Sequence, residues 1–499
     1  MDLVWVLAFF SFLAAFYVLK SKISNVNLPP GPPSLPFIGH FHILKFPLHR
    51  ALSHLSKKYG PIISLRFGMK PVVVVSSPSL AKECFTTNDI AFASRPRTAV
   101  GKYLGYDYLS VVWAPYGDHW RTLRKIQTLG LLSSTKIEMF ANVRREQVAA
   151  LFQSLLESSD EGEVVNMKDK ITETIFSVII KIVANRSYYG CRVEDQEAAK
   201  EFREVIDETS VVMRKLNLGD YIPFLRWIDL QGITRLMKVL QRKRDRILQG
   251  IVEEHKKSRS SGGGQLKPDF VHMLLDMKEK DPEYFTDDLI KSTIVVMIAA
   301  GTESTAVTIE CALALLLNHP EALQKAQTEL DQQVGRERLV EESDLPKLEY
   351  LQAIIYETLR LHPPGPILVP HESDAKCNLG GYTVPKGTML LVNAWHIHRD
   401  PDLWPEPLSF KPERFIESGI DVKGQDFRVI PFGSGRRSCP GIGLALRSVE
   451  YVLASLLHAF EWRKEGTELL DMLEGVGLKA MPLKAFATPR LSRQLYPIA

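Results

Sequence analysis

The stretch Pro431-Phe432-Gly433-Ser434-Gly435-Arg436-Arg437-Ser438-Cys439-Pro440-Gly441 decides how the rest of this 499-residue chain is interpreted. Its centre is Cys439, and four residues stand at fixed distances from it: Phe432 seven before, Gly435 four before, Arg437 two before and Gly441 two after. Glycines let a backbone turn sharply and approach a large planar group. Backbone N–H groups in such a turn can hydrogen-bond a thiolate, and an arginine can pair with an anionic edge. On these features alone a small buried apolar cysteine is the usual expectation. A cysteine that ligates the metal of a bound cofactor is the alternative that the spacing raises.

The composition is that of an ordinary globular protein with a sizeable core. Hydrophobic residues make up 45% of the chain and charged residues 24%. The net charge of +4 is small for this length, so it does not argue for a nucleic-acid partner. The five cysteines have no paired or zinc-like spacing: Cys84, Cys191, Cys311, Cys377 and Cys439. This odd and sparse count fits a reducing compartment without a disulfide framework.

The N-terminus carries a candidate membrane anchor. Leu3 to Leu19 contains seventeen residues and no charge, which is at the short end of a bilayer span. Asp2 precedes this run, whereas Lys20 and Lys22 follow it, so the positive-inside rule places the rest of the chain in the cytosol. We therefore predict an uncleaved anchor at residues 1–22. A cleaved signal peptide would have a basic start, and a buried core helix is the other alternative.

The anchor is followed by a proline-rich segment and then by a long body. Residues 23–35 contain Leu28-Pro29-Pro30-Gly31-Pro32-Pro33, which predicts a stiff, non-helical hinge. A ligand for a proline-recognition domain is the alternative. We expect residues 36–499 to form one catalytic domain. Ser258 to Gly264 has the composition of a flexible linker, and we interpret it as a surface loop rather than a domain boundary.

The body is predicted to be mainly helical, with small β-sheets. Short β-branched runs between Pro61 and Ser77 predict a small sheet, and Gly380 to Thr388 predicts a hairpin. Residues 135–257 look mostly helical and charged, and residues 443–460 look helical and apolar.

A long apolar helix is predicted from Thr286, as an N-terminal cap, to about Asn318, before His319-Pro320. Its middle reads Ala300-Gly301-Thr302-Glu303-Ser304-Thr305. Polar groups are costly inside an apolar helix, and hydroxyls there can bond back to the preceding turn and open the helix. The segment therefore indicates a functional turn, with a polar contact between two helices as the alternative.

Two further charged motifs have helical spacing. Trp120 and Arg124 are four residues apart and share one helix face, although a buried Trp beside a solvated Arg is an equally ordinary arrangement. Glu357 and Arg360 are three apart in an apolar helix pattern, so we expect a partly buried pair that needs further partners. Arg414 is the candidate third member.

Together and in this order, the motifs resemble those of the cytochrome P-450 family, whose cysteine loop has the pattern F-x-x-G-x-R-x-C-x-G. Every fixed position of that pattern is present. Within the family, the chain looks most like plant microsomal A-type members, namely isoflavone hydroxylases and lignan methylenedioxy-bridge (sesamin synthase-like) enzymes. The resemblance implies a mainly α fold with small β-sheets, a single transmembrane helix in the endoplasmic reticulum membrane, and a catalytic domain that faces the cytosol.

The resemblance also implies the cofactor and its contacts. Heme b (iron protoporphyrin IX) would have Cys439 as its axial thiolate, a ligand that favours O–O cleavage. Phe432, Gly435 and Gly441 would shape the loop. The implied propionate partners are Trp120, Arg124, His371 and Arg437. Glu357, Arg360 and Arg414 would form a structural triad.

The polar turn resembles the family's oxygen-activating motif, (A/G)-G-x-(D/E)-T. It matches at Ala300, Gly301 and Glu303, but Ser304 stands where the family usually has Thr, with Thr305 directly after it. The resemblance makes Glu303, Ser304 and Thr305 catalytic candidates for proton delivery. Serine keeps the hydroxyl but lacks the methyl group that restricts χ1, so its geometry is expected to be looser. Substitution at this position also occurs in members that close methylenedioxy bridges, which leaves the product type open.

The function implied is a monooxygenase that inserts one oxygen atom from O2 into an apolar aromatic plant metabolite, such as a flavonoid, isoflavonoid, lignan or other phenolic. NADPH-cytochrome P-450 reductase would supply electrons, with cytochrome b5 as a further candidate donor, and the substrate would arrive from the membrane lipid side. Alternatives are an oxidative ring closure, a reductase-independent rearrangement, and a heme-binding sensor or carrier without turnover. By position in the family, the substrate is expected to contact residues 103–113, 209–215, 294–303, 366–369 and 475–478.

Overall fold

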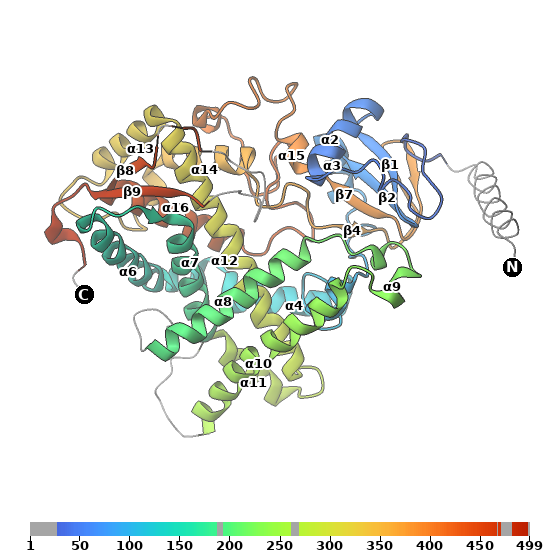
Figure 1. The fold of residues 1–499 in the computed structure, drawn as a ribbon, viewed down its shortest axis with the longest axis horizontal. Coiled ribbons are helices and arrows are strands. Elements are labelled where there is room, and N and C mark those ends of the chain that lie inside the picture. The colour runs from blue at the N-terminus through green and yellow to red at the C-terminus, as the bar shows by residue number, and fades with distance from the viewer. Residues whose placement is uncertain (1–26, 187–192, 261–268, 467, 471–481, 498–499) are drawn as a thin grey trace, which may run out of the picture.

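The computed structural model describes residues 27–186, 193–260, 269–466, 468–470 and 482–497. The predicted anchor, the substrate-contacting turn at 475–478 and most of the Ser258–Gly264 loop lie outside the described residues, so they stay predictions. Most of the described residues are helical, and three small sheets accompany the helices (Figure 1). The predicted mainly α fold with small β-sheets is confirmed.

The helices follow the chain in this order: α2 (Leu48–Tyr59), α3 (Pro78–Phe85), α4 (Asp118–Gln127), α5 (Ser134–Met139), α6 (Ala141–Asp160), α7 (Met167–Ala184), α8 (Val193–Met213), α9 (Leu225–Ile228), α10 (Ile233–Ser260), α11 (Phe270–Lys280), α12 (Asp287–Asn318), α13 (Pro320–Gln333), α14 (Glu349–Leu361), α15 (Ala394–Ile397) and α16 (Ile442–Ala459). Short π- or 3-10 turns lie between them: η1 (Val100–Leu104), η2 (Thr128–Leu132), η3 (Leu218–Asp220), η4 (Leu345–Lys347), η5 (Pro412–Phe415) and η6 (Arg493–Leu495).

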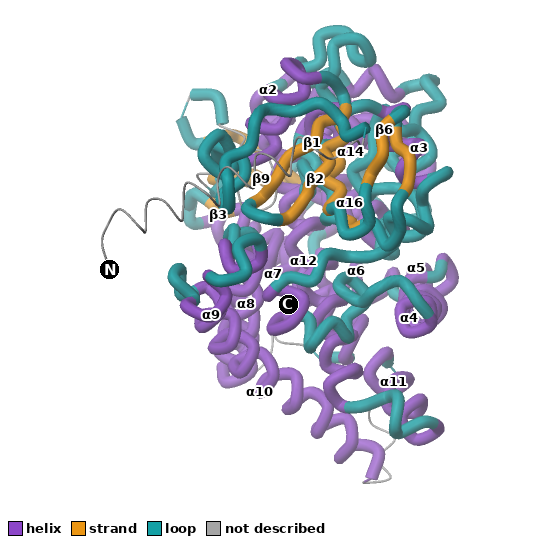
Figure 2. The backbone as a smooth tube through the Cα atoms, turned by 90° about the vertical axis from the view of Figure 1, so that its right-hand side faces the viewer, coloured by secondary structure: helices purple, strands orange, loops and turns teal. Residues whose placement is uncertain are grey.

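The strands form one four-stranded sheet, one three-stranded sheet and one hairpin. The first sheet has the order β1 (Ile62–Phe67), β2 (Lys70–Val75), β7 (Met389–Val392), β4 (His371–Glu372). The second has the order β3 (Val165–Asn166), β9 (Lys484–Pro489), β8 (Phe460–Lys464), and β5 (Cys377–Leu379) pairs with β6 (Tyr382–Val384). The first sheet lies at the opposite side of the molecule from β8 and β9 (Figure 1). Viewed from the side, β1, β2 and β6 lie above most of the helices (Figure 2).

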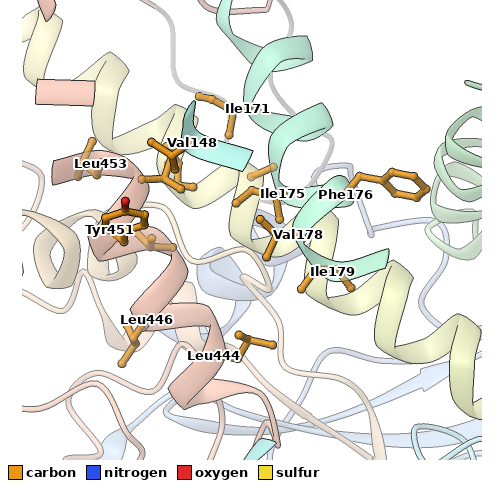
Figure 3. Packing of buried hydrophobic residues seen from close by; sticks show 14 of the residues in the cluster. Val148, Ile171, Ile175, Phe176, Val178, Ile179, Leu444, Leu446, Tyr451 and Leu453 are labelled. Carbon is orange, nitrogen blue, oxygen red and sulfur yellow. The ribbon is translucent and has the colours of Figure 1, made fainter. Parts of the chain in front are cut away.

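Helix α12 runs through the centre of the helical body. It is apolar on nearly all sides, which is the pattern of a helix surrounded by other elements. It packs against α7, α10, α14 and α16. Figure 3 shows Ile175 and Val178 of α7 on the side where α16 carries Leu444 and Tyr451, and all four belong to one buried cluster. Each large apolar side chain buried there contributes about 1.5–3 kcal/mol relative to exposure.

Two of the described helices, α12 and α16, are long and apolar enough to cross a bilayer by length and composition. Both are mostly buried inside the protein, so we interpret them as core helices.

The expected long helix is present as α12, with Thr286 capping its N-terminus by accepting a hydrogen bond from the Leu289 N–H at 3.2 Å. The hydroxyls in its middle do bond back to the preceding turn: Thr302 donates to the Ile298 carbonyl at 2.7 Å, and Ser304 donates to the Ala300 carbonyl at 2.8 Å. However, the helix is continuous and not opened. A carbonyl oxygen has two lone pairs, so it can accept a hydroxyl and keep its helical amide bond.

The proline-rich segment is held against the sheet from Pro30 onward. The Ser64 N–H of β1 donates to the Pro30 carbonyl at 2.8 Å. A Cβ atom at Gly31 would lie 2.2 Å from the Ser64 carbonyl oxygen, so only glycine permits this approach. His40 Nε2 lies 2.9 Å from the Pro32 carbonyl oxygen. The segment is non-helical as predicted, but its second half belongs to the folded body.

A buried ion pair joins α14 to the irregular segment before the cysteine loop. Glu357 and Arg360 are fully buried, and the Arg360 guanidinium donates to the Glu357 carboxylate at 2.6 and 2.8 Å. Arg360 also donates to the carbonyls of His398 and Pro407, at 2.7 and 2.8 Å. Arg414 Nε lies 3.3 Å from Glu357, so the predicted triad is in contact.

We expect Arg360→Met to destabilise the protein by about 3–5 kcal/mol, because it leaves the Glu357 carboxylate buried without its main partner. Urea unfolding of the purified protein measures this loss. Lys325→Met is the matched control, since Lys325 forms an exposed ion pair with Glu413, and such pairs contribute less than about 1 kcal/mol. Equal destabilisation by the two substitutions would contradict a supporting role for the buried pair.

Candidate active site

The cysteine loop is closed by its own backbone. The Cys439 N–H donates to the Phe432 carbonyl at 2.9 Å, and the Ser438 N–H donates to the Gly435 carbonyl at 3.1 Å. These bonds fold residues 431–441 into a compact turn directly before α16. Every side chain from 431 to 442 is half-buried, apart from the exposed Arg436. The loop therefore lies inside the protein without being fully covered by it.

Gly435 and Gly441, which were predicted to shape the loop, differ in what a side chain at each position would contact. Gly435 has φ +69°, and a Cβ atom there would lie 2.7 Å from Asp89 Oδ1 and 2.9 Å from the Phe85 carbonyl oxygen. This glycine is therefore required by its conformation and by the neighbouring segment. A Cβ atom at Gly441 would lie 3.9 Å from Cys439 Sγ, so a side chain there would stand beside the sulfur.

Burial raises the pKa of the Cys439 thiol, while a backbone hydrogen bond from Gly441 and the positive charge of Arg124 both oppose that rise. The surroundings of the sulfur thus already contain two groups that favour the thiolate. A metal ligated by the sulfur would complete its deprotonation.

Three arginines converge beside the loop. Arg437 donates to the carbonyls of Val111 and Ala114, at 3.0 and 2.6 Å, and to that of Ala93 at 2.5 Å. Arg124 of α4 donates to the Ser438 carbonyl at 2.7 Å. Arg95 donates to the carbonyls of Val369 and Pro370, at 2.7 and 2.9 Å.

Arg95 is buried, and Arg124 and Arg437 are half-buried. None of the three guanidiniums forms an ion pair with any residue that the structure describes. Burial and the charge of Arg437 lower the pKa of Arg95 to about 9. Burial and the charge of Arg124 lower the pKa of Arg437 to about 10, although Asp374 and Tyr116 oppose the shift. Arg95 Nε is buried without a hydrogen-bond partner. Buried charge of one sign is costly unless a counter-charge is supplied.

Trp120 and His371 lie beside the arginines of this group. The Arg437 guanidinium stacks over the Trp120 ring at 4.6 Å, and the indole N–H has no hydrogen-bond partner within the described part of the chain. His371 Nδ1 lies 2.7 Å from the Phe92 carbonyl oxygen. Burial and the charges of Arg95 and Arg437 hold the pKa of His371 well below its usual range. An anion bound among these groups would offset the lowering of the His371 pKa by the two arginines.

One stripe of α12 is incompletely covered, although most of the helix is buried. The stripe consists of half-buried or exposed residues at helical spacing: Val296, Ala300, Glu303, Ser304 and Val307. Ala300 is exposed even though it lies at the middle of a core helix. Side chains of the protein therefore leave space along this stripe.

The three predicted catalytic residues differ in position. Ser304 lies on the uncovered stripe, one turn after Ala300, whereas Thr305 is buried on the opposite side of the helix. Glu303 forms an ion pair with Arg214, with 2.8 Å between Nη1 and Oε1. The carboxylate and the Ser304 hydroxyl each have another partner, so the structure does not join them to each other.

Three of the expected substrate-contacting segments meet. Leu104 and Val212 lie in one buried apolar cluster with residues of α10. Val111 lies in another cluster, and Val296 of α12 packs against it. Leu368 lies next to the cysteine loop, because a Cβ atom at Gly433 would be 3.8 Å from Leu368 Cδ1. Segments 103–113, 209–215 and 294–303 are thus linked by apolar contacts, whereas segment 366–369 contacts the cysteine loop.

The arrangement fits heme b. A half-buried cysteine in a tight turn can ligate the iron, and three arginines without a counter-charge can bind the two propionates of the macrocycle. The unpartnered Trp120 N–H supplies a further donor. The apolar segments around α12 suit the apolar edge of the heme that carries no propionate.

The chain matches the model of the cytochrome P450 family over residues 29–487 and belongs to this family. The family consists of monooxygenases that bind heme b through a cysteine thiolate, use O2 and take electrons from a redox partner.

Curated relatives come from plants. The chain is 47% identical to cytochrome P450 81Q32 of Catharanthus roseus, across 93% of this chain and 92% of the relative. It is 46% identical to (+)-piperitol/(+)-sesamin synthase CYP81Q2 of Sesamum radiatum, across 94% and 92%. It is also 46% identical to an isoflavone 3'-hydroxylase of Medicago truncatula, across 96% of each.

Among solved structures, a zebra fish cytochrome P450 in complex with abiraterone has a TM-score of 0.74 and 28% identity, and the match covers 89% of this chain and all of that one. A second structure of a zebra fish cytochrome P450, with progesterone, matches equally well.

Sequence reasoning assigned no role to two residues of the site. Arg95 stands in Arg95-Pro96-Arg97, and the only sequence signal was a basic pair around a proline. Arg214 follows α8 in a charged segment, and its contact with Glu303 joins positions 89 residues apart. Such long-range contacts cannot be read from local spacing.

We expect Arg95→Gln to reduce heme retention, because it removes one of three cations that would neutralise the propionates. The ratio of Soret absorbance to protein, measured after gel filtration, should fall by at least twofold. Arg97→Gln is the control, since Arg97 stacks over Tyr108 outside the cluster. Unchanged heme content in Arg95→Gln would contradict the assigned role.

Proposed function

We propose that this chain is an NADPH-dependent monooxygenase that inserts one oxygen atom from O2 into an apolar aromatic plant metabolite. The observation that carries the proposal is the uncovered stripe of α12. It presents Val296, Ala300 and Val307 with one acid and one hydroxyl, and apolar side chains such as Val111 pack beside it. A flat apolar substrate with few polar groups suits such walls.

We assign the axial ligand to Cys439 and the propionate contacts to Trp120, Arg95, Arg124, His371 and Arg437. When bound, the heme supplies the one-electron and oxygen chemistry. The residues of this chain hold the cofactor, orient the substrate and move protons.

Proton movement falls to Glu303 and Ser304 in this proposal. Glu303 is partly exposed and ion-paired with Arg214, so it can exchange protons with solvent. The Ser304 hydroxyl lies on the uncovered stripe and can rotate away from the Ala300 carbonyl to donate elsewhere. Thr305 is buried away from that stripe, so we assign no proton to it.

The apolar walls of the site and the relatives both support the proposed substrate class. Two hydroxylases of isoflavones, from Medicago truncatula and Glycyrrhiza echinata, are 46% and 42% identical to this chain. We therefore propose a flavonoid, isoflavonoid, lignan or related phenolic as substrate.

An oxidative closure of a methylenedioxy bridge is the second candidate. It is favoured by Ser304 at the usual threonine position and by the (+)-piperitol/(+)-sesamin synthase among the relatives. The hydroxylase relatives leave a non-catalytic carrier without support.

We further propose that the protein is bound to the endoplasmic reticulum membrane, with the catalytic domain in the cytosol. Apolar side chains are exposed around α9: Phe224, Trp227, Ile228 and Leu230, with Trp227 89% exposed. Exposed Met69 is close by, because its N–H donates to the Tyr221 carbonyl at 2.9 Å. Such an exposed apolar group marks an interaction surface, and here it would contact lipid. NADPH-cytochrome P-450 reductase would deliver electrons, with cytochrome b5 as a second donor.

The proposed function is tested by incubating the protein, the reductase and NADPH with a panel of isoflavones, flavones and lignans under 18O2. Hydroxylation places one labelled atom in the product, whereas closure of a methylenedioxy bridge leaves the product unlabelled. We expect labelled hydroxylated products. Absence of any oxidised product across the panel would contradict the proposed substrate class.

We expect Glu303→Gln to lower kcat by about 100-fold, because a positioned acid–base group typically contributes that much or more. Substrate binding, followed by the shift of the Soret band, should be unchanged. Arg214→Gln is the matched control that breaks the same ion pair but keeps the carboxyl group. A loss as large in Arg214→Gln as in Glu303→Gln would show that the ion pair matters and the acid does not.

A further inference from the structure

A group of three metal-ligating side chains lies apart from the site described above. His255 is in the last turns of α10, Asp269 caps α11, and His272 is in the first turn of α11. The two helices pack against each other and lie together at the lower edge of the molecule (Figures 1 and 2). The candidate ligand atoms all lie within 4.8 Å of one another. None of the three residues has a role in the proposed oxidation.

The hydrogen bonds of His255 define which of its nitrogens faces the group. His255 Nδ1 lies 2.7 Å from the Ile251 carbonyl oxygen, so this nitrogen must carry the hydrogen. In a neutral imidazole, Nε2 then has only a lone pair. Yet Nε2 lies 2.9 Å from Asp269 Oδ2, which is another acceptor. Two acceptors at this distance require a cation between them, which is either a second proton or a metal ion.

Asp269 brings the second histidine into the same group. Its Oδ1 lies 2.9 Å from His272 Nδ1 and also accepts the His272 backbone N–H at 2.9 Å. One carboxylate therefore stands between two imidazoles, with one oxygen toward each ring. His255 is 2% exposed, and the side chains of Asp269 and His272 are 5% and 14% exposed, so the group is not a solvated surface cluster.

We propose that His255, Asp269 and His272 form a zinc site. Two histidines and one carboxylate, with water in the fourth position, are a common zinc ligand set. The measured separations of 2.9 Å are close to the roughly 3.3 Å expected between ligand atoms of a tetrahedral zinc. A ligating histidine almost always donates its other N–H to a carbonyl or carboxylate, and His255 donates to Ile251 in this way.

The partial exposure of His272 leaves room for the water ligand. Bound zinc would join the end of α10 to the beginning of α11, two positions 14 residues apart in the chain. A metal that binds only the folded protein stabilises it by linkage. The effect expected is therefore on stability and not on the oxidation.

The test uses the full-length, heme-loaded protein, stripped with a chelator and titrated with zinc chloride. Bound zinc is measured by elemental analysis after gel filtration, and its ligands by X-ray absorption at the zinc edge, where iron does not interfere. We expect one zinc per chain, with nitrogen and oxygen ligands at about 2.0–2.1 Å, and an increase in the unfolding temperature.

The decisive variant is His272→Gln, which keeps the Asp269 cap and the backbone of α11. It should weaken zinc binding at least tenfold, because loss of even an outer-shell partner typically has that effect. His54→Gln, on the exposed side of α2, is the matched control and should bind zinc like the wild type. An unchanged Soret spectrum shows that each variant is folded.

Equal zinc binding by the wild type and His272→Gln would overturn the proposal, as would a wild type that binds no zinc at micromolar concentration. In the second case the cation between His255 and Asp269 is a proton.

Discussion

Three arginines without an ion-pair partner among the described residues hold the surroundings of the Cys439 loop together, and of these Arg95 is buried while Arg124 and Arg437 are half-buried. Arg437, Arg124 and Arg95 donate to backbone carbonyls from four separate segments, and they thereby fasten those segments around the Cys439 loop. Carbonyl dipoles accept hydrogen bonds from the guanidiniums but do not neutralise their charge. Burial and the charge of a neighbouring arginine therefore lower the pKa values of Arg95 and Arg437. A dianionic heme bound among them would supply the missing charge. The residues that join these segments would then also bind the cofactor.

Helix α12 shows how one element can serve both packing and chemistry. Most of its surface is buried against α7, α14 and α16, which holds it in place. Its uncovered stripe then positions Ala300 and Ser304 with the rigidity of a core helix. Polar residues are tolerated in its middle because the Thr302 and Ser304 hydroxyls donate to carbonyls one turn earlier. Serine in place of threonine retains that bond and loses only the restraint of the methyl group.

Local patterns in the sequence predicted those parts of the structure that depend on local spacing. The bounds of α12, the small sheet that contains β1 and β2, and the Glu357–Arg360 pair follow from caps, β-branched runs and helical spacing. Local patterns did not predict the direction in which side chains point, or their partners far away in the chain. The buried position of Thr305 depends on how α12 is rotated in the core. Arg95 and Arg214 contact segments far away in the chain. Position 435 requires glycine because a Cβ atom there would clash with Asp89 and Phe85.

We propose that Cys439, held in its turn beside the three arginines, is the thiolate ligand of the heme. The most direct measurement is the absorption spectrum of the reduced protein with carbon monoxide, recorded for the wild type and for Cys439→Ala at equal protein concentration. We expect the wild type to show the red-shifted Soret band that only a thiolate ligand produces, and the variant to lose it completely. A Cys439→Ala protein that retained this band would contradict ligation by Cys439.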